Sequence, residues 1–255
     1  FLPVIDYSSK DSIKTLEKNN TSSTNKAFIS QYQSISSTFN EVHNWFTNSL
    51  GIEPDRSHLL LDKEYQDKLL TSETDQNTNV HKKIYRCFDE DNSFITIYQK
   101  LLSEICQKYR FASERLIVQS FPTIRLQFPG NISIFEFTND CLRSHPSQEI
   151  NTVYAVTECR ESTALWLQKA HSSGLKTFST FAPLNLRPGE YAQLDTANKW
   201  HGDTPNLTEK TRLSMDFRIL KDESSLSNLP TVSGKRKISI GSYYRYYDTY
   251  TCKFI

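Results

Sequence analysis

The sequence predicts an α+β fold in which a mainly helical amino-terminal part packs on a β sandwich or barrel. Two features indicate this fold. Apolar residues in the amino-terminal part recur with a helical period, whereas after Arg115 the chain changes to short runs rich in β-branched and aromatic residues. Proline, glycine and asparagine separate these runs. We therefore expect one structural domain, with residues 1–112 mainly helical and residues 113–255 forming the β core.

Three stretches of the amino-terminal part predict helices. Residues 23–50 carry apolar side chains at steps of three and four, the period of an amphipathic helix, and Gly51 and Pro54 end the pattern. Residues 94–109 show the same period, and residues 55–76 predict a more polar helix between the other two. These helices supply the apolar surface that covers one face of the β core.

The second part of the chain predicts strands. Each candidate is a short apolar run bounded by turn residues, and no internal repeat is visible. Many short strands after a helical block are typical of a compact sandwich or barrel. The runs are LIVQSF, TIRLQF, ISIFEF, INTVYAVT, STALWLQ, YAQLD and TRLSMDFRIL.

Composition narrows the class of partner. The 255 residues are 37% hydrophobic, enough for one sizeable core, and 30 basic against 29 acidic residues leave a net charge of +1. No strong electrostatic field therefore attracts nucleic acid or an anionic membrane, and a small molecule is the expected partner.

No apolar run reaches the roughly 18 residues that cross a bilayer. Five scattered cysteines predict free thiols and a cytoplasmic protein, with secretion after removal of a leader as the alternative.

The segment from Pro188 to Arg218 carries the clearest indication of a ligand site. A turn, a strand, His201 at the next turn and an Arg-x-Ser on the following strand form one hairpin-like unit. Arg212 and Ser214 share a face of that strand because alternate residues point the same way. The planar guanidinium of Arg212 offers a fork that binds a carboxylate in a bidentate manner. The alternative is a buried histidine bonded to a backbone carbonyl and a surface arginine.

Several motifs resemble one family, the streptomycin-cluster hydroxylase-like branch of the phytanoyl-CoA dioxygenase-type oxygenases. The resemblance covers roughly residues 115 to 250. The branch is in turn similar to the algal kainoid synthases, which close a pyrrolidine ring oxidatively on a prenylated glutamate. The matching motifs are PTIRLQFP from Pro122, EIN from Glu149, TALW from Thr163, PGE from Pro188, HG from His201 and TRLSMDFR from Thr211.

The resemblance implies a double-stranded β-helix, the jelly-roll or cupin-like barrel, that uses iron(II), 2-oxoglutarate and dioxygen. It implies that His201 is an iron ligand and that Arg212 and Ser214 bind the carboxylate of 2-oxoglutarate. Asn151 and Tyr154, on the strand INTVYAVT, are further candidates for the 2-oxoglutarate site. The alternative for both residues is a polar group in the core.

The chain departs from the family pattern at the His-x-Asp motif. That motif falls on Thr138-Asn139-Asp140, so threonine stands at the position of a ligand histidine. Downstream, His145 and Glu149 have the spacing at which cupin-type barrels place a metal-binding histidine and glutamate, and their donor atoms suit iron(II). We therefore expect His145, Glu149 and His201 to hold the metal, with Asp140 as the alternative carboxylate. The opposing interpretation makes His145 a loop residue and Glu149 a structural hydrogen-bond acceptor.

The candidates for substrate binding are Arg125, Arg143 and Trp166. For Arg125, a structural salt bridge is an equal alternative.

The predicted function is hydroxylation or oxidative cyclisation of a small, carboxylate-bearing, amino-acid-like metabolite in secondary metabolism. Two other functions compete with it. One is a non-catalytic cupin-like binding protein or degenerate oxygenase, and the other is a metal-dependent epimerase or hydrolase on the same barrel.

Overall fold

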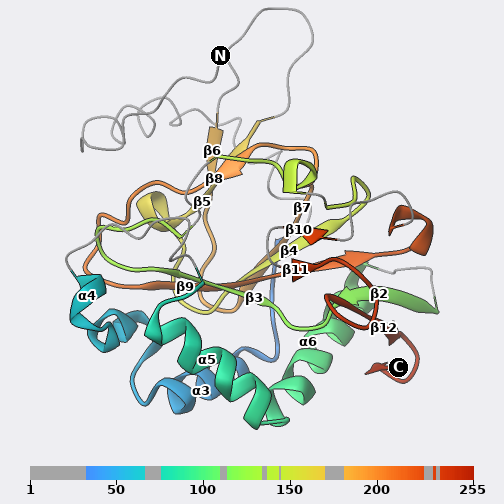
Figure 1. Ribbon diagram of the computed structural model, residues 1–255, viewed down its shortest axis with the longest axis horizontal. Helices are drawn as coiled ribbons and strands as arrows, with labels where there is room; N and C mark the ends of the chain where they lie inside the picture. Colours follow the sequence, from blue (N-terminus) through green and yellow to red (C-terminus); the bar gives the residue numbers. More distant parts are fainter. Residues whose placement is uncertain are drawn as a thin grey trace, which may run out of the picture.

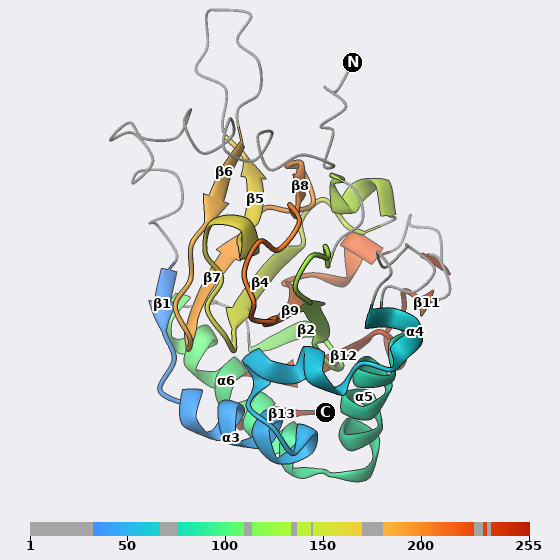
Figure 2. The same cartoon turned by 90° about the vertical axis from the view of Figure 1, so that its left-hand side faces the viewer.

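The fold has three layers: helices, a larger antiparallel sheet and a smaller antiparallel sheet. Figures 1 and 2 both show α3, α5 and α6 on one side of the larger sheet and β5, β6 and β8 on the other. The computed structural model describes residues 33–66, 76–109, 114–133, 137–143, 145–169, 181–226, 232–233 and 236–255. No helix within these ranges is long and apolar enough to cross a membrane.

The α-helices of the described residues lie between Phe39 and Tyr109 and agree in part with the prediction. The helix expected over residues 94–109 is confirmed as α6, whereas the expectation for residues 55–76 is met by a 3-10 helix and one short α-helix as far as Gln66. Residues 67–75 lie outside the described part. The bounds are α3 Phe39–Leu50, η3 Pro54–Leu60, α4 Lys63–Gln66, α5 Asn79–Glu90 and α6 Ser93–Tyr109.

The helix predicted over residues 23–50 is wrong at Gln33–Ile35, which form strand β1. These residues pair antiparallel with Glu190 to Ala192 of β7, so β1 extends the edge of the larger sheet. The stabilisation from backbone hydrogen bonds to an open sheet edge is larger here than the preference for a helix that the apolar spacing indicates. Residues 23–32 of the predicted helix lie outside the described ranges.

Helix α5 was not among the predicted helices, although the sequence carries signals for it. Thr78 is its N-cap, and the Thr78 hydroxyl accepts a hydrogen bond from the backbone N–H of His81. Val80, Ile84 and Phe88 follow at steps of four and are all buried. Most of the residues between these three are polar, so the apolar period is weak in the sequence.

The strands form two main sheets. Six of the seven runs predicted as strands are confirmed as β2, β3, β4, β5, β7 and β9. In the run ISIFEF, residues 132, 133 and 137 are described and lie in no strand, and residues 134–136 lie outside the described part. The larger sheet has the order β1-β7-β4-β9-β2-β12-β13, with β3 also paired to β9, and the smaller sheet has the order β6-β5-β8. The bounds are β1 Gln33–Ile35, β2 Arg115–Gln119, β3 Thr123–Gln127, β4 Ile150–Ala155, β5 Leu165–Gln168, β6 Phe181–Leu184, β7 Glu190–Leu194, β8 His201–Gly202, β9 Arg212–Leu220, β10 Val232–Ser233, β11 Arg236–Lys237, β12 Tyr244–Asp248 and β13 Lys253–Phe254.

The strand pairs are nested along the chain. From the outside inward, β3 pairs with β9, Thr138 bridges His201 of β8, β4 pairs with β7, and β5 pairs with β6. All of these pairs are antiparallel. The chain therefore runs out and back along itself while passing between the two sheets, and this brings residues near 138 next to residues near 201.

Strand β9 separates the core from the space between the sheets. Because successive side chains of a strand point to opposite faces, its apolar and polar residues divide cleanly. The apolar face packs with residues of α3, α5 and α6 in the main hydrophobic core, and the polar face lines a cavity toward the smaller sheet. The apolar residues are Leu213, Met215, Phe217 and Ile219, and the polar ones are Arg212, Ser214, Asp216 and Arg218.

Replacing Phe217 by alanine should lower the free energy of unfolding by about 3 to 5 kcal/mol, because the side chain is fully buried and its ring meets that of Tyr98 at 5.2 Å. Urea denaturation followed by circular dichroism measures the change. The control is Leu142→Ala, at a side chain that is 64% exposed, which should change stability by less than about 1 kcal/mol. Equal losses in the two variants would contradict this account of the core.

Candidate functional site

The polar face of β9 lines a small cavity between the two sheets. The cavity volume is about 20 Å³, room for about one water molecule. Its chemistry is unusual for a protein interior, because arginines from two strands line it together with a histidine and an aspartate. The lining residues are Arg125, Asn151, Val153, Leu165, His201, Arg212, Ser214, Asp216 and Arg218.

His201 presents its Nε2 to a carboxylate. Its Nδ1 lies 3.1 Å from the backbone carbonyl oxygen of Lys199. A carbonyl oxygen can only accept, so Nδ1 carries a proton, and in a neutral ring Nε2 is then the nitrogen with the lone pair. That Nε2 lies 3.6 Å from Oδ1 of Asp140, and both side chains are buried. Two lone-pair donors facing each other across this gap repel unless a cation or a proton lies between them.

Asp140 is held in its ionised form by its neighbours. Burial alone would raise the pKa of this carboxyl, but the charge of Arg218, the adjacent His201 ring and a hydrogen bond from Thr196 outweigh burial and hold the pKa well below its usual value. The Thr196 hydroxyl donates at 2.6 Å and Arg218 Nη2 donates at 3.2 Å, both to Oδ2. Oδ1 is therefore the oxygen that faces His201.

Arg218 neutralises three buried carboxylates at once. Its Nη2 contacts Asp140, its Nη1 lies 3.0 Å from Oδ2 of Asp216, and its Nε lies 2.7 Å from Oε1 of Glu149. Arg125 adds a second cation to Asp216, with Nε 2.8 Å from Oδ1. Burial would raise the pKa of Asp216, but Arg125 and Arg218 outweigh it and lower that pKa. A network of this kind is stable only when every charge in it is compensated.

The structure brings His145 and Glu149 together but not beside His201. Nδ1 of His145 lies 3.2 Å from both carboxylate oxygens of Glu149, and Tyr244 donates its hydroxyl to Glu149. The guanidinium of Arg218 contacts both Glu149 and Asp140, so it joins the two carboxylates. Asp140, the alternative carboxylate in the sequence analysis, is the one beside His201.

Thr138 lies directly across the strand pair from His201. The two residues exchange backbone hydrogen bonds of 2.9 and 2.8 Å, so their side chains share a face. Thr138, which the sequence analysis matched to a ligand histidine, therefore lies beside His201 but offers only a hydroxyl. In the part of the chain that the structure describes, no group of three or more His, Cys, Asp or Glu side chains is arranged to hold one metal ion.

Arg212 is placed at one end of the same cavity, with its fork engaged by Asp203. Nη1 and Nη2 of Arg212 lie 3.3 and 3.1 Å from the two oxygens of Asp203, and Ser133 contacts both side chains. Ser214 and Asn151, two other candidates for the 2-oxoglutarate site, line the cavity. Tyr154 does not, because it points to the opposite face of β4 and belongs to the core under the helices.

The three candidate substrate residues lie in three different environments. Arg125 lines the cavity and forms the ion pair with Asp216. Arg143 ends the short 3-10 helix η4 (Asp140–Arg143) and is exposed. Trp166 is fully buried, but its neighbour Leu165 lines the cavity, so the indole lies on the other face of β5. The structure brings only Arg125 to the candidate site.

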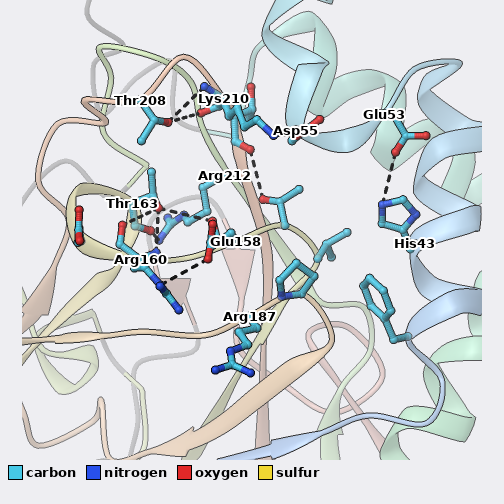
Figure 3. A pocket seen from close by; sticks show the side chains of 16 residues that line it. His43, Glu53, Asp55, Glu158, Arg160, Thr163, Arg187, Thr208, Lys210 and Arg212 are labelled. Carbon is cyan, nitrogen blue, oxygen red and sulfur yellow. Dashed lines mark hydrogen bonds and ion pairs between the residues drawn. The ribbon is translucent and has the colours of Figure 1, made fainter.

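A larger open cleft of about 820 Å³ borders Arg212 from the outside (Figure 3). One wall comes from the helical part, where His43 pairs with Glu53 at 3.6 Å. The other wall comes from loops of the β core, with Arg160 and Arg187 labelled in Figure 3. Arg212 lines both the cleft and the small cavity, so it joins the two spaces.

Sequence reasoning missed Asp203, Arg218 and Tyr244. For Arg218 a signal existed, since charged residues at alternate positions of an otherwise apolar strand predict a buried polar face. Asp203 carried a weaker signal, its position two residues after His201. Tyr244 lies in a run of aromatic residues, SYYRYY, in which nothing local distinguishes the tyrosine that reaches Glu149.

The donors fit a metal ion better than they fit a keto acid. His201 Nε2 and Asp140 Oδ1 are the atom types that bind iron(II), and the hydrogen bond from Nδ1 to Lys199 is the orientation that metal-bound histidines adopt. The carboxylate anchor does not fit a ligand in its present state. Asp203 engages the fork of Arg212, and about 20 Å³ of cavity cannot hold 2-oxoglutarate.

The buried charge network should make stability depend on pH. The pKa of Asp216 is lower in the folded protein than in the unfolded chain, so its contribution is complete above about pH 4 and is lost as the pH falls below that value. Asp216→Asn should therefore be less stable than the parent at pH 7, by about 3 kcal/mol, and the two should converge toward pH 2. Urea unfolding at each pH measures this. The control is Glu90→Gln, at an exposed helix end, whose free energy of unfolding should change with pH as that of the parent does. A difference in stability between Asp216→Asn and the parent that stays the same at every pH would contradict the lowered pKa.

Comparison with known proteins finds similarity in sequence to a streptomycin biosynthesis protein. No family model matches the sequence. The chain is 27% identical over 186 residues to the streptomycin biosynthesis protein StrG of Streptomyces griseus, across 72% of this chain and 82% of that protein.

Three solved structures are similar at low identity. The nickel complex of the non-heme monooxygenase ThoJ has 11% identity and a TM-score of 0.40, over 76% of this chain and 73% of that one. EctD from S. alaskensis with bound Fe has 13% identity and a TM-score of 0.42, over 80% of this chain and 78% of that one. The non-heme alpha ketoglutarate dependent carbocyclase SnoK from nogalamycin biosynthesis has 10% identity and a TM-score of 0.42, over 83% of each chain. The similarity to StrG spans most of both chains.

Proposed function

We propose that this protein is an oxygenase of the non-haem iron(II) type that takes 2-oxoglutarate as cosubstrate. The observation that carries the proposal is the pair formed by His201 and Asp140. Nδ1 of His201 is committed to the Lys199 carbonyl, so in a neutral ring Nε2 faces a carboxylate oxygen with its lone pair at 3.6 Å. A buried metal cation between these atoms removes their repulsion.

The nested strand pairs support a double-stranded β-helix for the core. Pairing of the first strand with the last, the second with the second-last and so on is what results when one long antiparallel hairpin is wound into a barrel. In this arrangement the segment with Asp140 and strand β8 with His201 come from adjacent positions of one sheet. Their proximity is then a consequence of the fold.

In the proposed enzyme, His201 and Asp140 hold the iron, which supplies the activation of dioxygen when bound. The protein's own residues orient the ligands and exclude water. Thr196 and Arg218 bind only Oδ2 of Asp140, and this leaves Oδ1 for the metal. Arg212 is the anchor for a carboxylate of the cosubstrate once Asp203 is displaced.

The proposed substrate is a small, carboxylate-bearing, amino-acid-like metabolite that is hydroxylated or oxidatively cyclised. The cleft of about 820 Å³ has the size of a small-molecule site and carries arginines on its wall. Similarity to a streptomycin biosynthesis protein supports a place in secondary metabolism.

A second candidate function is small-molecule binding without catalysis. It is favoured by Thr138, which offers a hydroxyl where the family pattern has a ligand histidine, and by the tie between Glu149 and Arg218. With two protein donors, iron depends on the keto acid and water for its remaining ligands. An oxygenase of this kind should therefore bind iron(II) and 2-oxoglutarate cooperatively, each raising the affinity of the other. Anaerobic titration tests this, because the chelated pair gives a visible absorption band and a metal-free binding protein gives none.

Metal binding should depend on Asp140 and His201 and not on Glu149 or His145. Asp140→Asn and His201→Ala should each weaken binding of cobalt(II), used as an air-stable probe, by at least about tenfold, because each removes a direct ligand. Cobalt absorption and equilibrium dialysis measure the affinity, and near-ultraviolet circular dichroism checks folding.

Glu149→Gln and His145→Ala are the matched controls and should bind cobalt(II) as the parent does. Loss of the metal in these two variants with retention in Asp140→Asn would restore His145, Glu149 and His201 as the ligand set.

Cosubstrate binding should depend on Arg212. Arg212→Met should weaken 2-oxoglutarate binding at least about tenfold, since a charge-assisted bidentate contact is lost, and should leave cobalt(II) affinity in the absence of 2-oxoglutarate nearly unchanged. Isothermal titration calorimetry gives both constants. Arg187→Met, at an exposed arginine of the cleft, is the control. Unchanged 2-oxoglutarate affinity in Arg212→Met would remove Arg212 from the site.

A further inference from the structure

Asp203 occupies the place on Arg212 that a carboxylate ligand would take. Its two oxygens meet Nη1 and Nη2 of Arg212 at 3.3 and 3.1 Å, the parallel geometry of a bidentate carboxylate. The side chain of Asp203 is 0% exposed and that of Arg212 is 3% exposed. The fork is thus already complementary to a carboxylate, and the carboxylate belongs to the protein.

The guanidinium of Arg212 is only partly satisfied by this contact. Nη1 also lies 3.4 Å from the carbonyl oxygen of Thr163, and Nη2 meets the hydroxyl of Ser133. The third donor, Nε, is buried and has no hydrogen-bond partner. A buried donor without a partner costs about 1 to 3 kcal/mol, so the site retains unused capacity for an acceptor.

Two carboxylates cannot both take the fork of Arg212. A bidentate carboxylate uses Nη1 and Nη2 together, and Asp203 already contacts both. The small cavity on the inner side of Arg212 has room for only about one water molecule, so it offers no second place for a carboxylate there. Entry of a carboxylate therefore requires Asp203 to leave.

The backbone next to Asp203 is held in place, so an exchange at Arg212 involves the side chain of Asp203. Gln127 Nε2 donates at 2.5 Å to the carbonyl of Thr204, and Asn206 donates at 2.9 Å to the carbonyl of Gln127. The backbone that carries Asp203 is therefore tied to β3. A route from solvent exists as well, because Arg212 borders the open cleft seen in Figure 3.

We propose that Asp203 is an internal competitor that closes the carboxylate site of Arg212, and that a dicarboxylate binds by displacing Asp203 from the guanidinium. Insofar as the ligand is 2-oxoglutarate, this rests on the proposed function, but the exchange itself needs neither iron nor oxygen. Asp203 then sets the affinity of the site, since a ligand reaches its full affinity only in the fraction of molecules with the fork open.

The experiment measures binding of glutarate, a dicarboxylate without the keto group, to metal-free protein. Asp203→Asn removes the competing charge and keeps the shape, so it should bind glutarate at least about tenfold more tightly than the parent. The double variant Asp203→Asn with Arg212→Met should lose this gain. Asp195→Asn, an exposed carboxylate in the loop before β8, changes the net charge equally and should bind as the parent does.

The proposal would be overturned if Asp203→Asn bound glutarate no more tightly than the parent does. It would also be overturned if the double variant bound glutarate as tightly as Asp203→Asn alone. Because the variant leaves Arg212 unpaired, its melting temperature should fall and should rise again with glutarate but not with the neutral analogue glutaramide. If Asp203→Asn does not fold without a ligand, the test uses Asp203→Ala refolded in the presence of glutarate. Recovery of folded protein then supports the proposal, and failure to recover any contradicts it. A positive glutarate result with no iron(II) binding would reject the oxygenase alone.

Discussion

The site depends on one buried cation, the guanidinium of Arg218. It meets carboxylates from η4, from the residue just before β4 and from its own strand. An uncompensated buried charge costs several kcal/mol, so these elements can pack together only in the arrangement that satisfies Arg218. The electrostatics of one side chain thereby constrain the space between the two sheets.

The same cation determines which carboxylate is available for a ligand. Glu149 lies against Arg218, His145 and the Tyr244 hydroxyl, so protein groups adjoin both of its oxygens, and Oε2 accepts a hydrogen bond. Asp140 gives only Oδ2 to Arg218 and Thr196, so Oδ1 is left facing His201. The distinction between a structural carboxylate and a potential metal ligand therefore arises from the side chains around each carboxylate and not from spacing along the chain.

Strand β9 connects the stability of the protein to the chemistry of the site. One face buries Leu213, Met215, Phe217 and Ile219 against the helices, and the other carries the charged residues that line the cavity. Because the two faces share one backbone, apolar packing under the helices holds Arg212 and Arg218 in position. Burial of four apolar side chains offsets the cost of keeping arginine and aspartate away from water.

The sequence by itself determined the features that follow a local period: the helix at Ser93–Tyr109, most strands, and the shared face of Arg212 and Ser214. Tertiary structure decided the rest. Gln33–Ile35 became a strand because a sheet edge was available, and Asp140 meets an arginine 78 residues away, a contact that no local pattern encodes. Periodicity is a property of neighbouring residues, whereas the compensation of buried charge depends on which distant residues the fold brings together.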